Sequence, residues 1–230
     1  MRSLRAIAGT IFDPVGTFRG LAEGPKTLLA LLFVVLAQLS VPLALSGRLD
    51  TRAAAMNELG PKIGEMTDRD VSEAIQQKEK IASVIIVAKA LVGPPLLALE
   101  LTIVLWLWGR YLRGKPAFGV LYSLCTHAQI PFALRALGRT AVILGRTQIE
   151  PDEVDNLLPS GLAPLFHGSQ PIAHALAGAD LFLLWTAVLL GIALYAAGKL
   201  SVTRAVVGMT LAYAAFVAVF LVALPGLGGA

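Results

Sequence analysis

Long apolar runs constrain this chain more than any other feature. Five runs of mostly uncharged residues occupy positions 27–45, 82–108, 117–137, 181–197 and 205–225. About 20 helical residues cross the hydrocarbon core of a bilayer, and a backbone inside it must satisfy its own hydrogen bonds. Only 15% of the residues are charged, whereas soluble domains have about a quarter. The sequence therefore predicts an all-α polytopic membrane helical bundle with five transmembrane helices.

Two of these runs contain interruptions. The second run holds Lys89, Glu100 and the pair Pro94-Pro95, and the third holds Pro131 and Arg135 near its end. Proline inside a helix removes a backbone donor and favours a kink. A division of the second run into two helices at "GPP" remains an alternative, although each half would be too short to cross a bilayer.

Basic residues in the short connections predict the orientation. The N-terminal segment carries Arg2, Arg5, Arg19 and Lys26. The link between the second and third runs carries Arg110, Arg113 and Lys115, and the link between the fourth and fifth runs carries Lys199 and Arg204. All three regions share one side if five runs cross, and Lys and Arg concentrate on the cytoplasmic side. We expect a cytoplasmic N-terminus, an outside C-terminus, and outer segments 46–81 and 138–180. The net charge of +4 is thus explained at the membrane surface, without nucleic acid.

Residues 1–26 precede the membrane domain, which we expect at 27–230. Apolar residues share one side of a helical pattern, with Arg2 and Arg5 beside it: Leu4, Ile7, Ile11 and Phe12. This pattern favours a short helix in the cytoplasmic headgroup layer, with an unstructured tail as the alternative. Pro14 follows Asp13 and predicts a new turn or helix there. A 26-residue start and a long apolar core are atypical of a cleaved signal peptide, so we expect the first run to be retained.

The chain shows no catalytic constellation. Motifs of zinc proteases, serine hydrolases, thiol redox proteins, phosphate loops and dinucleotide-binding folds are missing. The three histidines lack metal-ligand spacing, and the single cysteine, Cys125, lies in an apolar run, where a small buried side chain is expected. We therefore expect no enzyme activity, no cofactor and no metal site.

Three charges are predicted at one outer level. Counted from the inner ends at about 1.5 Å per residue, Lys89 lies about 28 Å up, Arg135 about 27 Å and Asp180 about 26 Å. Intramembrane charges usually face the bundle interior and have a partner. Asp180 also stands directly before the fourth run, where a carboxylate caps a helix. Two interpretations remain open: a cap alone, or a cap that also pairs with Arg135 or Lys89.

Glu100 and His127 are predicted nearer to mid-membrane. The same rise places Glu100 about 12 Å and His127 about 15 Å above the inner ends of their runs. A carboxyl and an imidazole that share a buried site can relay a proton. The structural alternatives are a neutral hydrogen-bonded pair that joins two helices, or a Glu100 that burial keeps protonated.

Two segments carry the small-xxx-small pattern that lets helix backbones approach one another. They are "AVLLG" at 187–191 and "GMTLA" at 208–212. Close packing within the bundle is the usual meaning of this pattern.

Several stretches resemble the bacterial branch of the Yip (Ypt-interacting protein) domain family. "IFDPVGTFRGLAEGP" is similar to the cytoplasmic lead-in of such proteins, "NLLPSGLAPLF" to their broken outer segment, and "DLFLLWTAVLLGIALYAAGKLS" to their fourth crossing and basic link. The resemblance implies five crossings, a location in the bacterial inner membrane, and no catalytic residue. It implies an accessory or scaffolding partner of other membrane proteins, with an ABC-type export system as one such partner.

Two other hypotheses remain beside this one. The first is a small oligomeric proton- or ion-coupled transporter or channel that uses Glu100 and His127. The second is a membrane-shaping protein that acts on the lipid bilayer through its N-terminal helix, with Arg2 and Arg5 at the membrane surface. The oligomeric state does not follow from the sequence.

Overall fold

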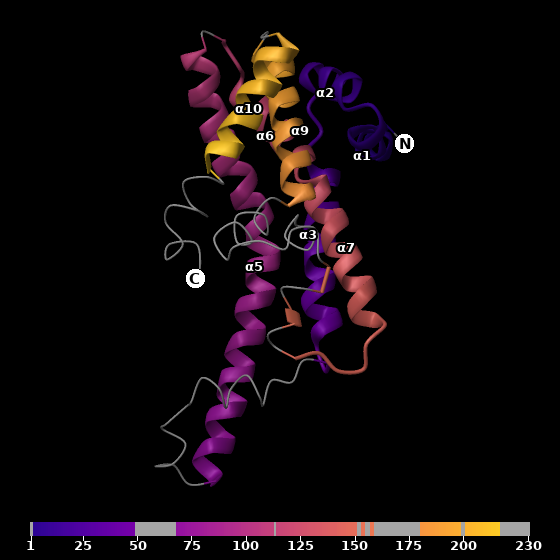
Figure 1. Ribbon diagram of the computed structural model, residues 1–230, viewed down its shortest axis with the longest axis vertical. Helices are drawn as coiled ribbons and strands as arrows, with labels where there is room; N and C mark the ends of the chain where they lie inside the picture. The colour runs from indigo at the N-terminus through magenta and orange to yellow at the C-terminus, as the bar shows by residue number, and fades with distance from the viewer. Residues whose placement is uncertain are drawn as a thin grey trace, which may run out of the picture. The chain divides into compact units, whose positions relative to one another are not determined.

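The computed structural model describes residues 2–48, 68–112, 114–150, 153–154, 157–158, 180–198 and 201–216. The regular elements in these ranges are helices (Figure 1): α1 Arg2–Phe12, α2 Pro14–Glu23, α3 Leu28–Leu45, α5 Asp68–Tyr111, α6 Phe118–Ala128, α7 Ile130–Leu144, α9 Leu181–Gly198 and α10 Val202–Phe216. No extended strand occurs in the same ranges, which confirms the all-α class.

Three of the described helices are long and apolar enough to cross a membrane. They are Leu28–Leu45, the part of α5 from Val84 to Tyr111, and Leu181–Gly198. The first, second and fourth predicted runs correspond to them within a few residues. The fifth run, predicted at 205–225, begins inside α10, and its last part lies outside the described residues. Contact of these helices with lipid follows from their length and apolar composition.

The second run is one helix that begins well before the membrane-spanning part. α5 has 44 residues and continues through Pro94 and Pro95, so no division at "GPP" occurs. The Pro94 carbonyl oxygen accepts a hydrogen bond from Gln129 Nε2 at 3.1 Å. This side-chain donor adds a contact where two successive residues lack backbone N–H groups.

The third run differs from a single helix over 117–137. It is divided into α6 and α7 at Gln129, and α7 extends to Leu144. Pro131 is the physical reason, because it has no N–H to donate to the carbonyl of residue 127. The Gln129 N–H donates instead to the Thr126 carbonyl at 3.3 Å.

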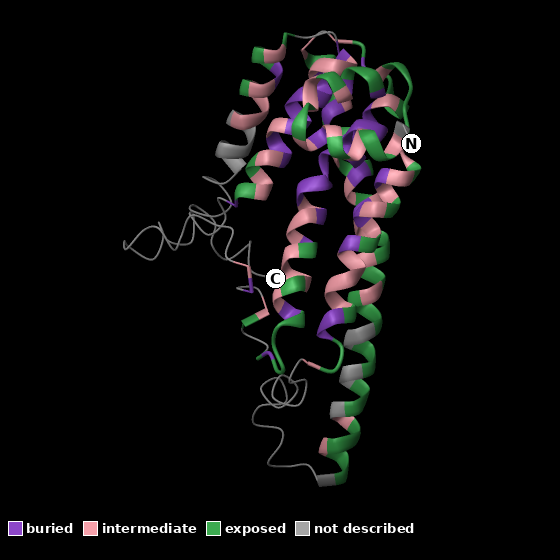
Figure 2. Ribbon diagram, turned by 90° about the vertical axis from the view of Figure 1, so that its right-hand side faces the viewer, coloured by how far each residue is buried: buried purple, intermediate pink, exposed green. Residues whose placement is uncertain are grey.

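The chain forms two compact units. The first comprises Met1–Val34, Pro94–Leu134 and Pro159–Ala230, and the second comprises Val35–Gly93 and Arg135–Leu158. The core of the first unit is built by α2, α5, α6 and α9, and its central buried side chains are Phe18, Leu105, Leu121, Leu124 and Leu189. Figure 2 shows buried residues concentrated along these helices.

Within the first unit, α9 and α10 pack closely. A Cβ placed on Gly191 would lie 2.7 Å from the Val206 Cα and 3.0 Å from the Ala205 carbonyl oxygen. Only glycine therefore permits this approach, and the "AVLLG" segment acts as predicted. A Cβ on Gly208 would meet nothing within 4 Å, so the glycine of "GMTLA" makes no such contact among the described residues.

The second unit has a smaller core of its own. It contains Ala44, Leu45, Ile143, Ile149 and Leu157. The hydroxyls of Ser40 and Thr140 lie 2.7 Å apart and join α3 to α7. The Ile149 N–H donates to the Arg48 carbonyl at 2.9 Å, so the segments that follow these two helices are joined as well.

Candidate functional site

The N-terminal segment and the two basic links meet at one end of the first unit. The charge pattern predicts all three on the same side of the membrane. Arg19 donates to the Tyr195 hydroxyl from Nε at 3.0 Å and also from Nη2, and its guanidinium carbon lies 5.2 Å from the Tyr195 ring centroid. These contacts attach α2 to the last turn of α9. A Cβ on Gly114, in the link after α5, would lie 3.0 Å from the Gly198 carbonyl oxygen. The N-terminal segment and both links therefore belong to one end of this unit.

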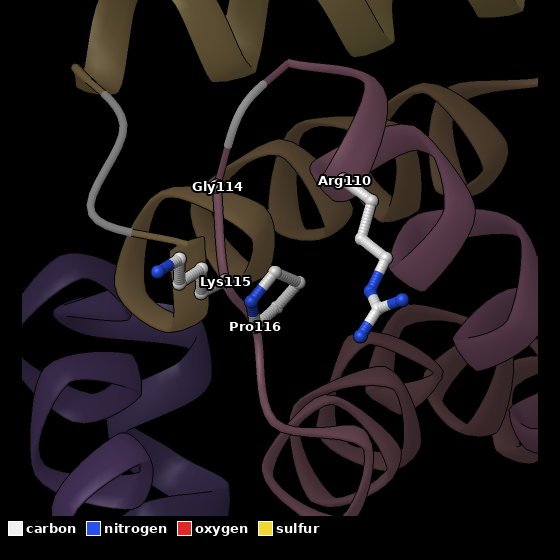
Figure 3. Close-up of a pocket in the computed structure, with 4 residues that line it drawn as sticks. All are labelled: Arg110, Gly114, Lys115 and Pro116. Atoms are coloured by element: carbon white, nitrogen blue, oxygen red, sulfur yellow. The ribbon is translucent and has the colours of Figure 1, made fainter.

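This end, hereafter the basic end, exposes more basic than acidic side chains, the acids of its N-terminal segment being Asp13 and Glu23. Its described basic residues are all exposed: Arg5, Arg19, Lys26, Arg110, Lys115 and Arg204. A hollow of about 530 Å³ is lined by Arg110, Gly114, Lys115 and Pro116. Figure 3 shows Lys115 and Arg110 on opposite sides of Pro116. The Arg110 guanidinium carbon lies 4.3 Å from the Trp106 ring centroid, an arrangement that holds the cation at the boundary of the span.

Asp180 caps α9, as its position before the apolar run predicts. Its Oδ1 accepts from the Phe182 N–H at 2.7 Å and from the Leu183 N–H at 3.2 Å, and the side chain is buried. The carboxylate therefore satisfies two of the N–H groups that a helix start leaves without intrahelical partners.

The other two members of the predicted charge cluster lie in the second unit. Arg135 is half-buried on α7, and Lys89 is exposed on α5. Because Asp180 belongs to the first unit and both cations to the second, the pairing of Asp180 with Arg135 or Lys89 stays a prediction.

Glu100 and His127 both lie in the first unit, but in different surroundings. His127 is buried, and its Nδ1 lies 2.9 Å from the Ser123 carbonyl oxygen one turn earlier in α6. Glu100 is exposed on α5. Within the described residues no hydrogen bond joins the two side chains, and their pairing stays a prediction.

The N-terminal helix is packed against the first unit. Ala6 and Val15 contact the core, and the buried hydroxyl of Thr10 donates to the Ala6 carbonyl. Arg5 is exposed, whereas the Arg2 side chain lies outside the described side chains. α2 begins at Pro14, with Asp13 as its cap, as the sequence predicts.

Several polar contacts escaped the sequence reasoning. Gln129 is fully buried and bridges to Pro94, and Tyr195 accepts from Arg19 across 176 residues. A glutamine two residues before Pro131 in an apolar run was a usable signal for the first. Nothing local pairs Arg19 with Tyr195, because that contact depends on the tertiary packing of α2 on α9.

Two features of the described residues bear on the requirements of a metal site and of a reactive thiol. Within the described part of the chain, no group of three or more His, Cys, Asp or Glu side chains is placed to hold a metal ion. Cys125 is a free cysteine and is fully buried, as expected for a small apolar side chain.

Comparison with known proteins identifies one family. Residues 8–224 match the family model of the Yip1 domain. No curated protein and no solved structure shows a significant match to this chain.

Proposed function

Because the chain belongs to the Yip1 domain family, and because its helices make it a multi-pass membrane protein, we propose that it binds and organises other membrane proteins. In this proposal it is a non-enzymatic accessory protein of the bacterial inner membrane. An ABC-type exporter is the partner class that the resemblance implies. The feature that supports a partner within the membrane is the exposed face of α5.

The described part of the chain covers little of α5. Only 11% of its most apolar stretch is buried within the structure, against 50% for α9. Exposed residues recur along the helix (Figure 2), whereas Ala98, Thr102 and Leu105 on its opposite side are buried. Such a surface faces lipid or the helix of another protein.

The position of Glu100 favours the helix of another protein over lipid as the environment of this face. It lies on this face together with three exposed apolar residues, Leu96 (49%), Ile103 (43%) and Leu107 (56%). The spacing of four, three and four residues is that of a helix–helix seam, here called the Glu100 seam. A carboxylate in the hydrocarbon region costs several kcal/mol unless it has a partner.

The seam defines the chemistry of its partner. A second helix that packs along Leu96, Ile103 and Leu107 must offer a cation or a hydrogen-bond donor level with Glu100. One polar residue within an apolar seam sets register and partner choice. The seam is thus suited to selecting one membrane helix among many.

The two alternatives have less support in the described residues. Proton-coupled transport needs Glu100 and His127 in one site, and no hydrogen bond joins them there. Membrane shaping needs an N-terminal helix that is free to insert lengthwise into lipid, whereas Ala6 attaches one side of α1 to the core of the first unit.

Site-directed photo-crosslinking in native membranes tests the proposal. A photoreactive residue at Ile103, on the seam, should form a discrete adduct with another membrane protein. The same residue at Leu184, which is exposed on α9 while the neighbouring charge of Asp180 is buried and caps the helix, should crosslink to lipid alone. The adduct at Ile103 should be lost with Glu100→Leu and retained in part with Glu100→Gln, which keeps hydrogen bonding.

Two results would contradict the proposal. The first is crosslinking of Ile103 to lipid only. The second is an adduct of twice the mass of the chain, because it would identify a second copy as the occupant of the seam.

A further inference from the structure

A second hollow of the basic end lies between the first two helices and the residues that follow them. Its volume is about 320 Å³, at the lower end of the roughly 300–1,000 Å³ of small-ligand pockets. The lining comes from α1, α2 and the start of the next segment: Arg5, Ala6, Gly16, Thr17, Gly20, Leu21, Gly24 and Lys26. We call it the hairpin pocket.

The formal charges that line the hairpin pocket are all positive. Arg5 and Lys26 are its charged residues, and Thr17 adds a hydroxyl. Asp13 is not among the lining residues, and its Oδ1 accepts the Gly16 N–H at 3.0 Å at the start of α2. A pocket with two cations and a hydroxyl suits a phosphate oxyanion.

The pocket is held at the place where the membrane-spanning part begins. The Lys26 N–H donates to the Ser123 Oγ at 3.1 Å, and Ser123 is fully buried on α6. The first span begins at Leu28, two residues later. Lys26 therefore lies at the level of the lipid headgroups.

Apolar side chains beside the pocket favour a lipid over a soluble anion. Leu4, next to Arg5, is 64% exposed, and Phe12 at the end of α1 is 85% exposed. Large apolar side chains exposed on a helix outside the spans, with a cation between them, are typical of contact with the headgroup–acyl boundary.

We propose that the hairpin pocket binds the phosphate of one anionic lipid headgroup, with Arg5 and Lys26 as its ligands. The site is distinct from the Glu100 seam, which lies on α5 and faces a protein. It is also distinct from a diffuse attraction between a basic surface and a membrane, because one headgroup enters a cavity of defined shape.

Native mass spectrometry of the full chain in neutral detergent counts bound lipids. Dioctanoyl phosphatidylglycerol should bind at one copy per chain, whereas dioctanoyl phosphatidylcholine should bind far more weakly. A basic residue at an anionic surface contributes about fivefold in binding, so Arg5→Gln with Lys26→Gln should weaken binding about 25-fold. The matched control is Arg69→Gln with Lys80→Gln, which removes the same charge from exposed positions of α5 and should leave binding unchanged.

A variant that keeps both charges separates the pocket from diffuse attraction. A Cβ on Gly20 would meet nothing within 4 Å, so Gly20→Leu should extend into the pocket without a clash, and leucine favours helix. We expect this variant to lose most of the bound lipid while its thermal stability is kept.

Three outcomes would overturn the proposal. Unchanged binding in Gly20→Leu would mean that charge alone attracts the lipid. Unchanged binding in the Arg5→Gln, Lys26→Gln variant would show that these two side chains do not bind the lipid phosphate. Displacement of the lipid by inorganic phosphate at equal concentration would make the site one for a soluble anion.

Discussion

Single residues determine where the helices of this protein begin and how they bend. Asp180 caps the first turn of α9 by accepting two N–H groups, and Asp13 caps α2 by accepting one, from Gly16. Gln129 separates α6 from α7 and bonds to Pro94 in α5. The two carboxylates satisfy backbone N–H groups that a helix start leaves without intrahelical partners, and Gln129 adds a side-chain donor to a carbonyl inside α5.

Asp180 offers a test that separates its two predicted roles. Asp180→Ala removes the cap and should lower the free energy of unfolding by about 0.5–2 kcal/mol. Asp180→Asn keeps an oxygen for the cap but no charge, so its stability should lie between wild type and Asp180→Ala if Arg135 or Lys89 is an ion partner. Denaturant unfolding in detergent, followed by tryptophan fluorescence, measures both. An Asn variant equal to wild type would leave the cap as the whole role, and an Ala variant equal to wild type would contradict the cap.

Pairs of helices depend on how closely their backbones approach. The contact of α9 with α10 is the clearest case, because Gly191 lies against the backbone of Val206. A side chain can relieve a clash by changing rotamer, but backbone atoms cannot, so the two helices must separate when a Cβ is added to Gly191.

Gly191→Ala should therefore destabilise the α9–α10 contact by about 1–3 kcal/mol. Gly208→Ala is the matched control in the neighbouring helix. Its Cβ has open space, and alanine favours helix over glycine by about 1 kcal/mol, so this variant should be neutral or slightly more stable. Thermal unfolding in the same detergent compares the two, and equal midpoints for both variants would contradict the close packing.

The whole molecule is a membrane protein whose predicted orientation rests on its basic residues. The basic end collects the N-terminal segment and both basic links in the first unit. Because Lys and Arg stay on the cytoplasmic side, we expect this end to face the cytoplasm and residue 150 to face outward.

Cysteine labelling with a membrane-impermeant maleimide tests that orientation. Cys125 is fully buried, so it can remain while Lys115→Cys and Glu150→Cys, both at exposed positions, report the two sides. Glu150→Cys should react in intact cells, and Lys115→Cys only after the membrane is opened. Labelling of both variants from the same side would be incompatible with the predicted topology.

Much of the fold was predictable because apolar length is a local property. The runs 27–45, 82–108 and 181–197 correspond to helices that are able to span a membrane, since a backbone in lipid has few alternatives to helix. The start of α2 at Asp13-Pro14 and the cap at Asp180 were predictable for a similar reason, because each depends on neighbouring residues only.

The sequence by itself determined the class of the protein, the helices α3, α5 and α9, and the caps at Asp13 and Asp180, since these depend on interactions within a few residues. Only the tertiary structure decided which polar groups meet. It placed Arg19 on Tyr195 and Gln129 on Pro94, exposed Glu100 while burying His127, and formed the hairpin pocket from Arg5 and Lys26. Such contacts join residues far apart in the chain, and their geometry is set by side-chain packing between helices.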